Sequence, residues 1–175
     1  MNRCRYCGKE TAIAQLISGY GKVCNGCRKE LGYAAVLLTA DDTAELIPYV
    51  EPVMSEEKME EILGAVRVEA LKASETVFGA DIGAVLMIDE LGKVTEPRKQ
   101  YNMAATVLYG KRDPVSRVMK DYVAGDALLM TRHEMEGIPA YGTHLYPIAV
   151  AEKIYDLVED QYLTRIREIK EEKSE

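Results

Sequence analysis

Two closely spaced cysteine pairs near the start of the chain constrain its fold more than any other feature. The sequence reads Cys4-Arg5-Tyr6-Cys7 and, after sixteen further residues, Cys24-Asn25-Gly26-Cys27. Two residues between paired cysteines let one tight turn direct both sulfur atoms at a single ion, and structural zinc takes four ligands in a tetrahedron. The spacing therefore predicts one zinc ion held by Cys4, Cys7, Cys24 and Cys27.

Such a short segment needs the metal in order to fold. It cannot bury enough apolar surface by itself, whereas metal binding contributes roughly 10–16 kcal/mol in comparable peptides. Four thiolates leave no open position for water, so we expect a structural and not a catalytic ion. A redox-active cysteine pair would normally need only one such motif. An iron–sulfur cluster also accepts four cysteines, but two tight pairs far apart in the sequence favour a single-ion site.

The same segment resembles the zinc-binding domain at the front of ClpX-type unfoldases, over about residues 1–35. The matching stretches are Cys4-Arg5-Tyr6-Cys7-Gly8-Lys9, Leu16-Ile17-Ser18-Gly19 and Lys22-Val23-Cys24-Asn25-Gly26-Cys27. The resemblance implies a treble-clef finger whose second cysteine pair begins a helix, here over residues 28–38. It also implies a module for dimerisation and partner recognition. The ATPase body of that family has no counterpart, because the phosphate-binding motif G-x-x-x-x-G-K-[ST] does not occur.

Charge is distributed unevenly along the chain. The net charge is −7, yet residues 1–31 contain six basic against two acidic side chains, so the remainder is strongly acidic. An acidic body is repelled by phosphate, which disfavours nucleic acid as a partner. The basic module could still bind an anionic partner, or its cations could simply offset the charge of a zinc–thiolate centre. Those basic residues are Arg3, Arg5, Lys9, Lys22, Arg28 and Lys29.

The sequence predicts a cytoplasmic protein without a membrane span. No apolar run reaches the ~18–20 residues that a span requires, and the N-terminus enters the cysteine module without a leader pattern. Thiols stay reduced in the cytoplasm, which agrees with cysteines used as metal ligands.

Composition and turn residues divide the chain into three parts: a zinc module over residues 1–38, a connector over 39–54 and an α+β domain over 55–175. The connector is expected because Pro48 and Pro52 disfavour a long helix. In the third part, the pattern predicts the order α-β-β-β-α-β-β-α, with an antiparallel sheet covered by helices. The expected helices run from Ser55 to Gly79, from Asp113 to Gly125 and from Ile148 to a frayed end after Lys170, and the expected strands are 84–88, one near Val94, 103–109, 127–131 and 138–143.

Polar residues at expected strand ends form a second candidate site, for a small-molecule ligand. A histidine beside a carboxylate can act as a general base, and the tyrosine-rich strand region suits a pocket or an interface. Its candidate residues are Asp89, Glu90, Arg98, His133, Glu134 and His144.

Three functions follow from these features. The first is a zinc-binding regulator or adaptor whose finger recognises a protein partner and whose α+β domain binds a ligand or self-associates. The second is a small enzyme acting on a polar metabolite at the candidate site, and the third is nucleic-acid binding through the basic module.

Overall fold

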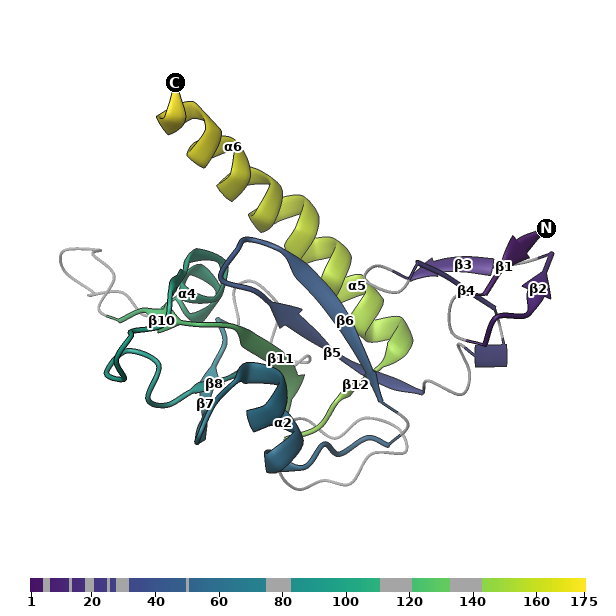
Figure 1. The fold of residues 1–175 in the computed structure, drawn as a ribbon, viewed down its shortest axis with the longest axis horizontal. Coiled ribbons are helices and arrows are strands. Elements are labelled where there is room, and N and C mark those ends of the chain that lie inside the picture. The colour runs from purple at the N-terminus through teal and green to yellow at the C-terminus, as the bar shows by residue number, and fades with distance from the viewer. Residues whose placement is uncertain are drawn as a thin grey trace.

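A computed structural model of the chain describes residues 1–4, 7–12, 14–17, 21–24, 26–27, 32–49, 51–74, 83–110, 121–132 and 143–175. Its central element is a six-stranded sheet in which neighbouring strands pair antiparallel (Figure 1). The strands are β5 (Tyr33–Leu38), β6 (Ala44–Tyr49), β7 (Val68–Lys72), β8 (Ala84–Asp89), β11 (Ala127–Thr131) and β12 (Tyr146–Pro147).

Strand β5 lies inside the sheet. One edge pairs with β6 along its whole length, while the other pairs with β11 at its end and with β12 at its start. Strands β8 and then β7 follow beyond β11. The apolar run of β5 suits this place, because a strand with neighbours on both sides and helices on both faces has no polar surface to present.

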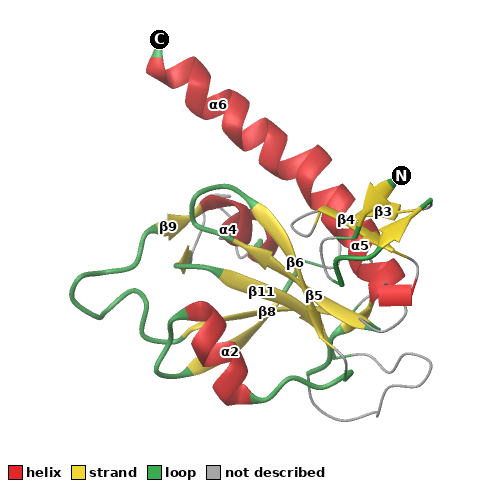
Figure 2. Cartoon of the chain, turned by 45° about the vertical axis from the view of Figure 1, so that its right-hand side comes forward, coloured by secondary structure: helices red, strands yellow, loops and turns green. Residues whose placement is uncertain are grey.

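Alternate residues of the strands supply two separate apolar layers. On one side of β5, Val36 and Leu38 pack in the larger core, while Ala35 and Leu37 pack in a smaller one on the other side. The smaller layer is covered by α2 (Glu56–Leu63), and the larger by α4 (Met103–Tyr109) and α5 (Ile148–Val158). The sheet therefore lies between helices, as Figure 2 shows for α2 and α5.

The C-terminal helix continues well past the sheet. Helix α5 passes through a π-helical turn, η2 (Glu159–Leu163), into α6 (Thr164–Ser174), whose end projects from the body (Figure 1). Arg167 donates two hydrogen bonds to the Asp42 carbonyl, at 3.1 and 2.9 Å, and Lys170 pairs with the Asp42 carboxylate. These contacts hold the first two turns of α6 against the turn between β5 and β6.

Three two-stranded sheets complete the described structure. Strand β1 (Asn2–Arg3) pairs with β2 (Glu10–Thr11), and β3 (Ala14–Ile17) pairs with β4 (Gly21–Cys24). The third joins β9 (Tyr101–Asn102) to β10 (Val123–Ala124). The first two lie beside α5 in both views (Figures 1 and 2). No helix among the described residues is long and apolar enough to cross a membrane.

The combination of helices with antiparallel sheet confirms the α+β class, and several predicted elements are also confirmed. Strands occur at 84–89 and 127–131, the helix after Ser55 begins where expected, and a long helix begins at Ile148. The Ser55 side chain accepts a hydrogen bond from the Lys58 amide, so the predicted N-cap is present.

Other elements were predicted wrongly in the first half of the chain. Residues 33–38 form a strand and not a helix, and the expected connector contains β6. Pro48 is tolerated there because β6 lies at the edge of the sheet, where a missing N–H costs little. The helix from Ser55 ends at Gly64, whose left-handed backbone stops it, and β7 follows.

Further corrections concern the second half. Residues around Val94 form turns, and residues 103–109 form a helix and not a strand. At the expected end of the helix predicted from Asp113 to Gly125, residues 123–124 form strand β10 instead. The last helix extends to Ser174, beyond the expected end near Lys170. The predicted helix start at Asp113 and most of the expected strand at 138–143 lie outside the described residues. How many independently folding units the chain contains stays a prediction.

Candidate metal centre

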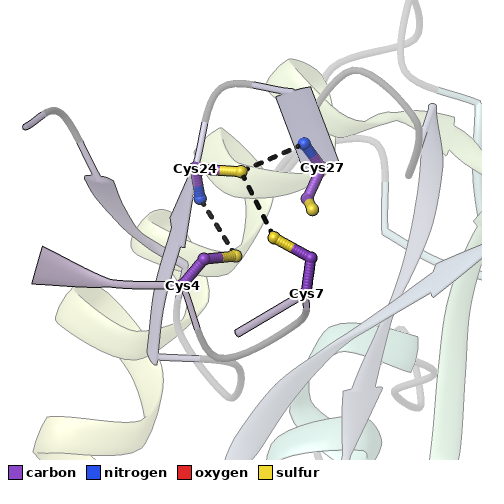
Figure 3. A group of neighbouring side chains, drawn as sticks. All are labelled: Cys4, Cys7, Cys24 and Cys27. Carbon is purple, nitrogen blue, oxygen red and sulfur yellow. Dashed lines mark hydrogen bonds between the residues drawn. The ribbon is translucent and has the colours of Figure 1, made fainter. Parts of the chain in front are cut away.

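The four cysteines meet at one point in space (Figure 3). Their sulfur atoms all lie within 4.8 Å of one another, and the Cys7 and Cys24 sulfurs are 3.9 Å apart. A tetrahedral zinc ion with Zn–S bonds of ~2.3 Å requires sulfurs separated by ~3.8 Å. The cluster therefore has the ligands and nearly the dimensions that such an ion needs, and it could hold a metal ion.

Short backbone turns bring each cysteine pair to this point. Cys4 follows β1, its amide donates to the Lys9 carbonyl at 2.8 Å, and its carbonyl accepts from the Gly8 amide at 2.9 Å. Gly8 has a φ of 74°, a conformation that residues with a Cβ rarely adopt. This turn reverses the chain so that Cys7 faces back toward Cys4. The second pair begins where β4 ends at Cys24.

Backbone amides point at two of the sulfurs. The Cys24 amide donates to the Cys4 sulfur at 3.4 Å, and the Cys27 amide donates to the Cys24 sulfur at 3.5 Å (Figure 3). These two hydrogen bonds help to hold the Cys4 and Cys24 sulfurs in place within the cluster.

Among the described residues, the centre contacts the larger core through the cysteines that are shielded from solvent. Cys4 and Cys27 are 1% and 5% exposed and belong to the larger core, which also contains Ala151 and Ile154 of α5. Cys24 is half-buried and Cys7 is exposed. Cys24 packs against the same core, so three of the four cysteines contact it, while Cys7 faces solvent.

Crowding of the thiols has an electrostatic consequence at Cys27. Hydrogen bonding with the Cys7 thiol, then burial, and then the Cys24 and Cys4 thiols raise the pKa of the Cys27 thiol well above its ordinary value. Four sulfurs this close cannot all ionise without a cation among them. A bound divalent metal reverses the effect, because a coordinating thiol is deprotonated outright.

Two of the described basic side chains, Arg3 and Lys22, bind groups within the module itself. Arg3 donates to the Gly8 carbonyl at 3.0 Å, and the Lys22 ammonium donates to the Asn2 side chain at 2.6 Å. Lys9 is exposed. Arg5, Arg28 and Lys29 lie outside the described residues.

The candidate small-molecule residues fall into separate places. Asp89, 6% exposed, forms an ion pair with Lys99 at 2.8 Å and accepts a hydrogen bond from the Leu91 amide at 3.0 Å. Glu90 pairs with Arg67 at 2.7 Å, and Arg98 is an exposed side chain 4.0 Å from Glu96. Both candidate acids, Asp89 and Glu90, therefore already have basic partners within the protein.

His144 lies at the other end of the sheet. Its backbone exchanges two hydrogen bonds with Thr131, which pairs with Ala84 at the start of β8, whereas Asp89 ends that strand. Asp89 is five positions after Ala84, which is ~17 Å along a strand. His144 is 1% exposed, and within the described part of the chain neither ring nitrogen has a hydrogen-bond partner. His133 and Glu134 lie outside the described residues.

Sequence reasoning did not identify Lys99, whose ammonium group joins the end of β8 to the end of α2. Besides Asp89, its ammonium binds the carbonyls of Leu63 and Gly64 at 2.8 and 2.9 Å, at the C-terminal end of α2. A cation favours this end of a helix because its last carbonyls lack partners. No pattern in the sequence relates Lys99 to residues 35 and 36 positions earlier.

No protein-family model, curated protein or solved structure matches this chain. The resemblance to the unfoldase finger, with its treble-clef fold, stays a prediction.

Proposed function

We propose that the chain is a zinc-binding regulatory or adaptor protein. Its N-terminal module holds one structural zinc ion through Cys4, Cys7, Cys24 and Cys27 and recognises a protein partner, while the α+β part binds a ligand or self-associates. The observation that carries this proposal is the convergence of four sulfurs to within 4.8 Å of one another.

The choice of zinc follows from the donor set. Four thiolates in a tetrahedral arrangement favour zinc or iron–sulfur chemistry over harder cations, which prefer oxygen. The separation of 3.9 Å between Cys7 and Cys24 is close to the edge of a ZnS4 tetrahedron. All four positions would be filled by protein, so the ion supplies structure and not a bound nucleophile.

An adaptor role is supported by how the ligands are distributed. Among the described residues, this cluster is the only group of three or more histidine, cysteine or acidic side chains placed to hold a metal. The candidate acids at Asp89 and Glu90 are paired with basic side chains at the opposite end of β8 from His144. Cys7, Gly8 and Lys9 are exposed, which leaves this part of the zinc module available to a partner.

Metal content combined with X-ray absorption tests the zinc centre. Protein purified without added metal is expected to contain one zinc per chain, with four sulfur neighbours at ~2.3 Å. Absence of stoichiometric metal, iron in place of zinc, or a coordination shell containing oxygen would defeat the proposal.

Partner recognition is tested with a matched pair of surface variants. Lys9→Glu reverses an exposed charge on the zinc module, whereas Lys153→Glu reverses one on α5. Proteins captured by the zinc-loaded chain should be lost with Lys9→Glu and kept with Lys153→Glu. An identical set of captured proteins for the wild type and for a zinc-free chain would rule out recognition by the module.

A further inference from the structure

The four sulfurs of the metal centre differ sharply in their access to solvent. Cys4 and Cys27 are buried at 1% and 5% exposure within the core shared with α5. Cys7 is exposed, and its sulfur lies 3.9 Å from that of half-buried Cys24 (Figure 3). A reagent in solvent therefore reaches the Cys7 sulfur more readily than the other three, and the Cys24 sulfur lies next to it.

We infer that Cys7 is an oxidation site, at which a peroxide joins Cys7 to Cys24 in a disulfide and thereby releases the zinc ion. This inference rests on the proposed zinc binding. It adds a regulatory input to the same centre, with a hydroperoxide as the class of oxidant.

The disulfide forms in two steps, through a sulfenic acid at Cys7. In the first, the Cys7 thiolate attacks one oxygen of hydrogen peroxide, the O–O bond breaks, and the products are a sulfenic acid and hydroxide. In the second, the Cys24 thiolate attacks the Cys7 sulfur, the S–O bond breaks, and a disulfide and a second hydroxide form. Two thiolates lose one electron each, and the peroxide is reduced to two hydroxides, which take up protons from water.

The geometry favours this pair over pairs that include the buried cysteines. A disulfide bond is ~2.05 Å long, so the sulfurs of Cys7 and Cys24 must approach by nearly 2 Å. Cys7 lies in a solvent-exposed turn that can supply the movement. Cys24 is half-buried and packs against the larger core, whereas Cys4 and Cys27 are buried members of it. An equal displacement of a buried member would open a cavity.

Loss of the metal follows from loss of the ligands. The disulfide consumes two of four thiolates and leaves only Cys4 and Cys27, half of the set that a structural zinc ion needs. The module would then lose the free energy of metal binding. Oxidation would thus remove whatever surface the zinc-loaded module presents.

The test begins with full-length protein whose zinc content has been measured. The protein is treated with hydrogen peroxide while a colorimetric chelator records released zinc, and remaining thiols are then alkylated. Trypsin separates Cys7, in residues 6–9, from Cys4, in residues 4–5, and leaves Cys24 and Cys27 together in residues 23–28. We expect zinc release together with peptide 6–9 cross-linked to peptide 23–28 at Cys24, with Cys27 alkylated.

Two variants sharpen the result because histidine can replace a thiolate as a zinc ligand. Cys7→His should retain zinc and release it at least ~10-fold more slowly, since the exposed thiolate is gone. Cys24→His should still form a sulfenic acid at Cys7, which a dimedone probe labels. If either variant fails to bind zinc, the peptide map of the wild type decides alone.

Each outcome bears on the inference separately from the proposed function. A preparation without zinc before treatment defeats the proposed function and the inference together. A preparation with one zinc that keeps it under peroxide, or that yields any other disulfide, overturns the inference and leaves the zinc centre standing.

Discussion

The N-terminal segment and the six-stranded sheet differ in the interactions that stabilise them. In the segment before β5, the described strands are two to four residues long, and the feature that unites them is a cluster of four sulfurs. In the sheet, every described residue of β8 and β11 is buried between two apolar layers. The first region should depend on a bound ion, while the second should depend on packing and on satisfied polar groups.

The largest expected effect is the loss of the metal. Cys24→Ser removes one ligand and with it most of the roughly 10–16 kcal/mol that zinc contributes to such modules. We expect no stoichiometric zinc and rapid proteolysis within the first 31 residues, while the sheet keeps its circular dichroism and its cooperative unfolding. The control is Lys9→Ser, a nearby exposed residue that is not a ligand. Stoichiometric zinc in Cys24→Ser would show that the N-terminal segment does not depend on this ligand for metal binding.

A cavity in the sheet should have the opposite consequence. Leu129 is 0% exposed at the middle of β11, so Leu129→Ala should lower the free energy of unfolding by about 2–5 kcal/mol and leave zinc content unchanged. Denaturant titration measures the loss. Leu91→Ala, at a site 37% exposed, is the matched control and should cost far less. Equal losses for the two variants would show that the core is not packed as described.

Removing the cation at Lys99 tests whether Asp89 is structural. Lys99→Met leaves a carboxylate that is 5% exposed without its partner and uncaps α2. We expect a loss of about 3 kcal/mol, at the low end for such pairs because Lys99 itself is 25% exposed. Lys58→Met, which breaks an exposed pair with Glu61, should change stability by less than ~1 kcal/mol. If Lys99→Met were as stable as the wild type, the ion pair would not be structural, and Asp89 would again be a candidate for ligand binding.

The smallest predicted effect concerns Tyr146. Its hydroxyl donates to the Met130 carbonyl at 2.7 Å, so Tyr146→Phe should cost about 1 kcal/mol at neutral pH. Burial raises the pKa of Tyr146 well above its ordinary value of 10.0. Above pH 10 the unfolded chain therefore loses this proton while the folded chain retains it, and stability falls as the pH rises.

The Phe variant lacks that proton and should lose less stability than the wild type between pH 10 and 11. Parallel pH profiles of the two proteins would contradict the assignment.

Sequence reasoning succeeded where the determining interactions are local. The spacing of Cys4 and Cys7 and of Cys24 and Cys27 encodes the cluster directly, and Ser55 encodes the start of α2. The continuous apolar runs of β8 and β11 were assigned as strands on length and composition. Local patterns of this kind need no knowledge of distant neighbours.

It failed where distant partners decide. Residues 28–38 are expected to continue as a helix, both from their own sequence and from the resemblance to the unfoldase finger. Pairing with β6, β11 and β12 instead makes residues 33–38 a strand. The helix α4 was missed although Asn102 provides a cap, accepting a hydrogen bond from the Ala105 amide at 3.0 Å. Lys99 acquires its role only once α2 and β8 are adjacent.

Hydrogen exchange of the full chain, with zinc bound and after its removal by a chelator, tests the central contrast most directly. The account predicts that amides of β3 and β4 lose protection on metal removal while those of β5, β8 and β11 keep theirs. Equal protection of β3 and β4 with and without zinc would show that the metal does not stabilise the module. Joint loss of protection in the module and the sheet would show that the two regions are not stabilised independently.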